Sequence, residues 1–150
     1  MNDPMTILEH DHVEAKEVLT MLGTSKPGKE RHDMVAKVTA ALELHMAIEE
    51  ALVYPLVETV EGADVRHEAD IEHGMARAGL TTMNEMVDKP GFCAAAESLL
   101  GGILHHVREE ETEILPTLKK KLSAAEWVAL GDQIAAAHAA GKIPATHATR

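Results

Sequence analysis

The chain has 150 residues and a formal net charge of −11, with 45% hydrophobic and 26% charged residues. This length predicts one globular domain, and the acidity argues against binding to a nucleic-acid backbone, which requires a concentrated basic surface. No apolar segment approaches the ~20 residues of a membrane span, and the N-terminus lacks the basic and apolar regions of a secretory signal. We therefore expect a cytoplasmic protein with neither nucleic acid nor membrane as a partner.

Prolines, glycines and a capping signature divide the sequence into five predicted helices. Asp3-Pro4 begins the first helix, and Ser123-Ala124-Ala125-Glu126 has the pattern of a capping box for the last. The helices are expected at about residues 3–23, 29–60, 63–87, 92–122 and 123–141. The remaining residues, 142–150, are expected to form a flexible tail.

Apolar residues recur every three or four positions in the first four predicted helices, which is typical of the buried face of a bundle helix. The aromatic residues are restricted to Tyr54, Phe92 and Trp127, so aliphatic side chains must build the core. Short connections make neighbouring helices antiparallel. The sequence therefore predicts an all-α fold: an up-down-up-down four-helix bundle over residues 1–122, with an accessory helix at 123–141 packed outside it.

Each of the four predicted apolar stripes contains one histidine where a leucine would be usual. Glutamates follow two of these histidines after four residues, at positions 49 and 110. Buried imidazoles and carboxylates are costly unless something pairs with them. A metal cluster in the bundle core would provide that pairing, and the candidate ligands are His12, His45, Glu49, His73, His106 and Glu110.

A repeat between the two halves of the chain supports this selection. Residues 45–55 and 106–116 both read His-x-x-x-Glu-Glu-x-x-x-x-Pro, and this alignment selects His106 and Glu110 over the neighbouring pair His105 and Glu109. Residues four apart project from one side of a helix. A mixed nitrogen and oxygen ligand set without thiolates suits iron or manganese, with zinc as a further alternative. Two such ions ~3.5–4 Å apart can bind a small oxygen ligand.

These segments resemble the hemerythrin-like, or His-His-Glu cation-binding, domains over about residues 5–121. The resemblance rests on Glu9-His10-Asp11-His12, on the two His-x-x-x-Glu-Glu blocks, and on Glu72-His73 in the third predicted helix. It implies a four-helix bundle with a non-haem di-iron centre, bridged by carboxylates and by an oxo or hydroxo group. It also implies that the six histidines and glutamates named above are the metal ligands.

The sequence departs from the oxygen-carrying members of that family at one position. Those members have two histidines four residues apart on the third helix, but here the first falls on Ala69. A water or another side chain can fill the space, and Tyr54 is the candidate. On an ideal helix Tyr54 is ~140° away from the direction of Glu49, so Pro55 or a local bulge would have to turn it inward. Otherwise it is a groove residue with its hydroxyl in water.

The expected function is decomposition of hydrogen peroxide, with Glu49 and Glu110 as bridges and Tyr54 tuning the metals or donating a proton. The alternatives are the binding, sensing or scavenging of oxygen or nitric oxide, and iron homeostasis. One of His67, Asp70 and Glu72 is expected to orient a ligand through a hydrogen bond. The other histidines are expected at the surface or behind a ligand: His10, His32, His105, His138 and His147.

Overall fold

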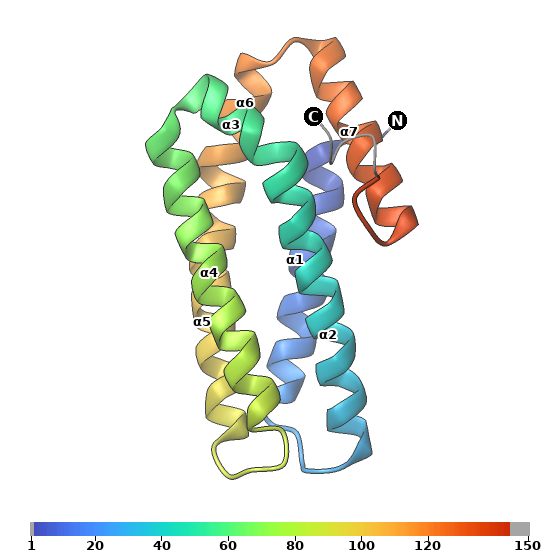
Figure 1. The fold of residues 1–150 in the computed structure, drawn as a ribbon, viewed down its shortest axis with the longest axis vertical. Helices are drawn as coiled ribbons and strands as arrows, with labels where there is room; N and C mark the ends of the chain where they lie inside the picture. The colour runs from blue at the N-terminus through green and yellow to red at the C-terminus, as the bar shows by residue number, and fades with distance from the viewer. Residues whose placement is uncertain (1, 145–150) are drawn as a thin grey trace.

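A computed structural model of the protein describes residues 2–144 and confirms the all-α fold, with no strand among those residues. Two long antiparallel pairs form the bundle (Figure 1). They are α1 (Pro4–Leu22) with α2 (Lys29–Ile48), and α4 (Ala63–Glu85) with α5 (Phe92–Glu109). The fifth predicted helix is α7 (Ala124–Ala140), which lies outside the bundle.

The second and fourth predicted helices are each interrupted by a widened, π-helical turn. The turn η1 (Glu49–Val53) joins α2 to α3 (Tyr54–Glu61), and η2 (Glu110–Ile114) joins α5 to α6 (Leu115–Lys121). A proline follows each turn after one residue, at positions 55 and 116. Proline has no N–H and its ring clashes with the carbonyl four residues back, so an α-helix cannot continue through it unchanged. The repeated sequence thus has a repeated backbone irregularity.

The ends of the other helices agree with the sequence signals to within a few residues. Asp3 caps α1, because its side chain accepts a hydrogen bond from the backbone N–H of Thr6 at 2.9 Å. Ser123 and Glu126 form the expected capping box of α7. The third predicted helix ends at Glu85 rather than at residue 87. Part of the expected flexible tail, residues 145–150, lies outside the described residues.

The bundle interior has two apolar clusters, which we call the upper and lower cores. The upper core, near α3 and α6, includes Leu8, Val53, Val57, Leu115 and Leu118. The lower core, toward the loops that join α1 to α2 and α4 to α5, includes Leu19, Val38, Leu80, Phe92 and Leu99. The buried histidines and glutamates come from the part of each helix between these clusters.

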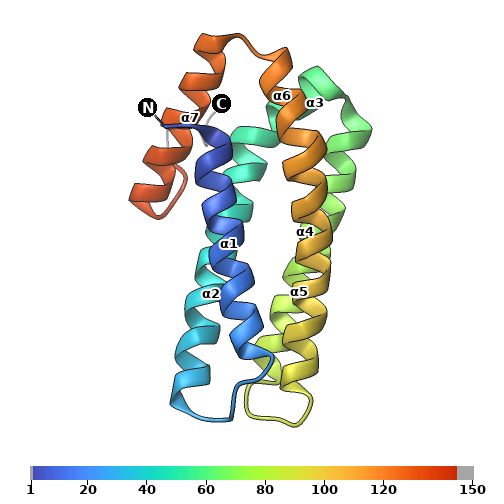
Figure 2. The same cartoon turned by 180° about the vertical axis from the view of Figure 1, so that it is seen from behind.

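Helix α7 packs near the N-terminal half of α1 at the upper end of the molecule (Figures 1 and 2). The Trp127 indole donates a hydrogen bond to Asp3 Oδ1 at 3.0 Å. Gly131 permits the close approach, since a Cβ at this position would lie 1.8 Å from the carbonyl oxygen of Asn2. None of the helices in the described part of the chain is long and apolar enough to cross a membrane.

Candidate metal centre

The six histidines and glutamates selected from the sequence come together between the two cores. Glu49 and Glu110 have no exposed surface, and the four histidines are also buried. Two groups of donor atoms form, each with all of its atoms within 4.8 Å of one another. One contains His12 and His45, the other contains His73 and His106, and both glutamates belong to both groups. The shared carboxylates are therefore placed to bridge two cations.

The distances between donor atoms are those of a compact cluster. The Nε2 atoms of His12 and His45 are 3.1 Å apart. Glu49 Oε1 lies 3.2 Å from Nε2 of His45 and 3.1 Å from Nε2 of His73. Glu110 reaches both groups in the same way, with Oε1 3.2 Å from His12 Nε2 and Oε2 3.1 Å from His106 Nε2.

A second carboxylate lies behind every one of the four histidines and hydrogen-bonds its Nδ1. The distances from Nδ1 to the carboxylate oxygen are between 2.6 and 2.9 Å. A carboxylate on one ring nitrogen fixes the tautomer and leaves the other nitrogen facing the cluster. The pairs are His12 with Glu111, His45 with Asp11, His73 with Glu50, and His106 with Glu72.

Of these four carboxylates, only Glu72 was expected from the sequence to orient a ligand. Glu72 does orient a ligand candidate, but its partner is His106 on α5 rather than its neighbour His73. His67 is exposed, and Asp70 pairs with Arg66 at 3.5 Å. The sequence did contain a signal for all four carboxylates. Two are the second Glu of each His-x-x-x-Glu-Glu block, and the other two immediately precede His12 and His73.

Tyr54 lies inside the cluster, with its side chain fully buried. Its hydroxyl is 3.0 Å from His73 Nε2, 3.1 Å from His106 Nε2, and 2.9 Å from Glu110 Oε2. The alternative in which this hydroxyl contacts water is therefore wrong. The turn η1 is the expected bulge: the Tyr54 N–H donates to the carbonyl of Glu49, five residues back. Tyr54 consequently lies one turn above Glu49 on the same side of the chain.

The counterpart of Tyr54 in the other half is apolar, so the two cation groups differ. Nine residues after His45 comes Tyr54, whereas nine residues after His106 comes Leu115. Leu8 occupies the position four residues before His12, where the third helix has Ala69 before His73. Leu8, Ala69 and Leu115 are all buried in the upper core beside Tyr54. The phenol thus occupies the side of the centre where a small residue replaces the expected histidine.

The pKa values of three of the histidines, His12, His45 and His106, are raised by the carboxylates around them. Burial lowers the pKa of His106, but its hydrogen bond and charge attraction to Glu110 outweigh this and raise the pKa to about 9. The pKa of His45 is raised well above its usual value, because Glu49 and Asp11 outweigh the effect of burial. Burial, together with Glu49 and Glu110, raises the pKa of Tyr54, so the phenol keeps its proton unless a cation replaces it.

The donor set fits a pair of metal ions. Glu49 Oε2 and Glu110 Oε1 are buried and form no hydrogen bond in the described part of the chain, although Glu110 Oε1 is 3.2 Å from His12 Nε2. A buried carboxylate oxygen without a hydrogen bond is costly. The close Nε2 atoms of His12 and His45 likewise need a proton or a cation between them. Imidazole nitrogen with carboxylate and phenol oxygen suits iron, manganese or zinc rather than calcium or magnesium.

The remaining histidines of the described residues are not part of the cluster, but two of them contact a carboxylate that lies behind a ligand candidate. His10 and His32 are exposed, and His105 pairs on the surface with Glu109 at 3.1 Å and with Glu72 at 3.7 Å. His138 of α7 donates to Asp11 Oδ1 at 2.7 Å, and Asp11 also accepts from His45. The accessory helix is therefore linked to a ligand candidate through one carboxylate. His147 lies outside the described residues.

Comparisons with known proteins identify the fold and the family of the chain. The chain is similar in fold to the crystal structure of a hemerythrin HHE cation-binding domain-containing protein from Mycobacterium kansasii. The TM-score is 0.83 and the sequence identity 24%, over 94% of this chain and 88% of the other. No curated protein sequence matches the chain. The family model for the hemerythrin HHE cation-binding domain matches residues 3–118. Because this match covers most of the chain, the protein belongs to the hemerythrin HHE family and is a metal-binding helical bundle.

Proposed function

We propose that this bundle holds two iron ions and decomposes hydrogen peroxide to oxygen and water. In this proposal His12 and His45 hold one ion, and His73, His106 and Tyr54 hold the other. Glu49 and Glu110, which belong to both groups of donor atoms, would be shared between the two ions. The observation that supports the proposal is the Tyr54 hydroxyl, which is 3.0 Å from His73 Nε2 and belongs to the cluster. Manganese and zinc are the alternative metals.

The phenol is the reason for choosing peroxide decomposition over reversible oxygen carriage. An anionic oxygen ligand favours the ferric state, whereas an oxygen carrier must keep a durable ferrous pair. When bound, the iron pair supplies the two-electron chemistry. One peroxide molecule loses two electrons and two protons to become O2, and a second takes them up to become two waters. In the alternative role for Tyr54, the phenol does not bind iron but keeps its proton, 2.9 Å from Glu110 Oε2, and donates it during this exchange.

The two neighbouring glutamates of α5 and η2 allow a matched test of the site. We expect Glu110→Ala to lose bound iron and to reduce oxygen evolution from peroxide by at least about a hundredfold, since even the loss of a residue behind a ligand costs about 10–100-fold. Glu109→Ala is the control, because Glu109 faces His105 at the surface. Metal analysis and oxygen-electrode rates would measure both effects.

Two results would overturn this proposal. Full iron content and full activity in Glu110→Ala would show that the site is assigned wrongly. A reversible spectral change under oxygen, without gas evolution on addition of peroxide, would favour the oxygen or nitric oxide binding protein instead.

The role of Tyr54 has its own spectroscopic test. We expect the oxidised iron-loaded protein to show a visible charge-transfer band from iron-bound phenolate, in addition to near-ultraviolet absorption from bridged ferric ions. Tyr54→Phe should lose the visible band while keeping the near-ultraviolet absorption, because the histidine and glutamate donors are unchanged. Wild-type protein without the visible band would contradict the assignment of Tyr54 as a ligand.

A further inference from the structure

The bundle contains a cavity of about 520 Å³ that begins at the metal centre and extends through the lower core. All four ligand-candidate histidines line its inner end. Its wall is aliphatic and comes from α1, α2 and α5, with Ala15, Leu42, Met46, Leu99 and Ile103 as the main lining residues. The cavity thus joins the metal centre to an apolar volume inside the bundle.

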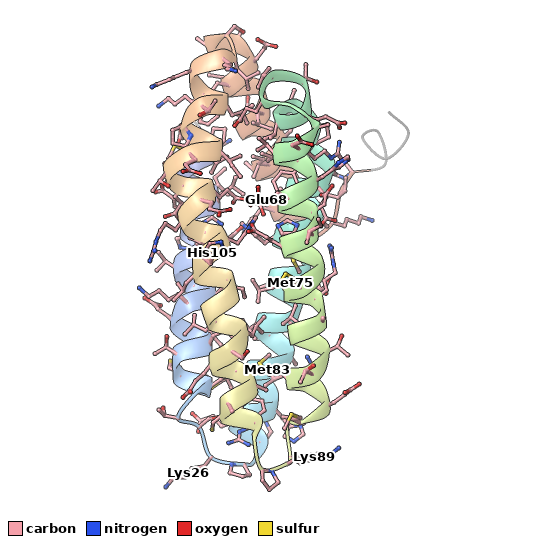
Figure 3. All side chains as sticks on the ribbon, turned by 90° about the vertical axis from the view of Figure 1, so that its left-hand side faces the viewer. Lys26, Glu68, Met75, Met83, Lys89 and His105 are labelled. Carbon is pink, nitrogen blue, oxygen red and sulfur yellow. The ribbon has the colours of Figure 1, made fainter. Side chains whose placement is uncertain are left out.

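Small residues on α4 and α5 form the outer part of this cavity. Ala76 and Gly79 of α4 and Gly102 of α5 line it. Gly102 is exposed, and a Cβ added there would meet nothing within 4 Å. The opening is therefore on the α4–α5 face, which Figure 3 views with Met75 labelled on α4 and His105 on α5. Met75 lines the cavity and is 69% exposed, so the opening has an apolar rim.

The size and chemistry of the cavity exceed what hydrogen peroxide requires. One water takes ~30 Å³ in the liquid, so a molecule of two oxygen atoms would occupy only about a tenth of the space. Cavities of about 300–1,000 Å³ are typical of sites for organic ligands. Away from the metal centre the lining is mainly apolar, with Thr82 and Ser98 as its polar residues, so this part offers water few of the polar partners that it needs. The volume suits an apolar molecule.

The residues that line the cavity also limit the class of that molecule. No lysine or arginine is among the described residues that line it, so the part of the cavity away from the histidines offers a phosphate group no counter-charge. No phenylalanine, tyrosine or tryptophan of the described chain lines it either, so an aromatic ring system would have no stacking partner. A flexible alkyl chain needs neither, and it gains free energy from contact with aliphatic side chains. The polar end of such a ligand belongs at the histidines.

We propose that the cavity binds the alkyl chain of an organic hydroperoxide, ROOH, and presents its peroxide group to the metal centre. This inference rests on the proposed peroxide chemistry and names a further substrate class for it. The O–O bond of ROOH breaks, and its two oxygens end in an alcohol, ROH, and a water. Hydrogen peroxide is the reductant: it gives up two electrons and two protons and leaves as O2. The sum is ROOH + H2O2 → ROH + H2O + O2.

Two adjacent glycines of α5 provide a matched pair of variants for the test. Both are exposed and have open space at the Cβ position, but Gly102 lines the cavity and Gly101 does not. The probe is 1-octanol, which has the alkyl chain without the O–O bond, titrated calorimetrically into the iron-loaded protein. We expect Gly102→Leu to weaken octanol binding at least tenfold and Gly101→Leu to leave it unchanged. When octyl hydroperoxide and hydrogen peroxide are added together, the rate of 1-octanol formation by Gly102→Leu should fall by the same factor as its octanol binding.

The outcomes separate this inference from the proposed function. Octanol binding that is absent from the wild type, or equal in the two variants, overturns the cavity assignment. If hydrogen peroxide is decomposed but octyl hydroperoxide gives no octanol, the substrate assignment is wrong and the proposed function stands. If octanol binding depends on Gly102 but hydrogen peroxide is not decomposed, the proposed function fails and the cavity remains a site for alkyl chains.

Discussion

At the scale of single residues, the centre depends on pairs in which one carboxylate holds one imidazole. The pairs alternate around the cluster: Asp11 and Glu72 each reach a histidine on the next helix of their own half. Glu50 and Glu111 each reach a histidine in the other half. Every histidine is thereby fixed by a residue from a different helix. The ring orientation that a metal requires is set before any metal binds.

The pair of Glu72 with His106 can be tested by removing the negative charge. Glu72→Gln should reduce metal affinity by about 10–100-fold, as is usual for the partner behind a metal-binding histidine. Glu68→Gln is a suitable control, since Glu68 lies on the same helix and is exposed (Figure 3). Competition with a chelator of known affinity would measure the change. Equal affinities in the two variants would contradict the orienting role of Glu72.

At the scale of secondary-structure elements, the two π-helical turns separate the two halves of the centre chemically. Each turn begins at a bridging-glutamate candidate, and the first residue after the turn is buried and donates its N–H to that glutamate's carbonyl. After η1 this residue is Tyr54, and after η2 it is Leu115. The two π-helical turns therefore place the hydroxyl of Tyr54 on one side of the cluster and the apolar side chain of Leu115 on the other.

The packing of α7 gives a second prediction at this scale. Gly131→Ala should lower the melting temperature, because its Cβ would collide with the carbonyl of Asn2 and push α7 away from α1. Gly101→Ala should raise the melting temperature, because replacing an exposed helical glycine that has free space at Cβ adds about 0.4–1 kcal/mol to the free energy of unfolding. Thermal unfolding followed by circular dichroism would compare them. A melting temperature unchanged by Gly131→Ala would show that the contact with Asn2 relaxes easily.

At the scale of the whole molecule, the metal centre divides the bundle interior into two apolar parts. The polar layer includes two carboxylates with no exposed surface, Glu49 and Glu110. Their burial is unfavourable unless positive charge accompanies them. Metal ions therefore act as part of the core, and their binding free energy adds to the stability of the folded state.

Removing the metal should consequently destabilise the whole bundle. At a free metal concentration about 100 times Kd, binding adds about 2.7 kcal/mol. For a chain of this length, that corresponds to a rise of roughly 5–10 °C in melting temperature. We expect chelated protein to melt lower by this amount and to recover when ferrous iron is added. Magnesium is the control, because it prefers a set of oxygen ligands with bound waters. Identical melting temperatures with and without iron would contradict a structural role for the metals.

The sequence alone was sufficient to predict the bundle and the six histidines and glutamates that meet in its core. Periodic apolar positions define which side of a helix is buried, and His12 or Glu49 at such a position violates the pattern visibly. The repeat distinguished Glu110 from Glu109 because both halves of the chain place equivalent residues at equivalent heights. These are local properties, which the order of residues along one helix determines.

Only the tertiary structure decided the histidine–carboxylate pairs, the direction of Tyr54 and the cavity, because these features depend on contacts between helices. A carboxylate such as Asp11 looks like any half-exposed acidic residue until another helix brings His45 against it. The direction of Tyr54 depended on a single widened turn, which the prolines suggested without fixing the geometry. The cavity beside the histidines is lined by residues of α1, α2, α4 and α5. Its volume is a property of the packed helices together.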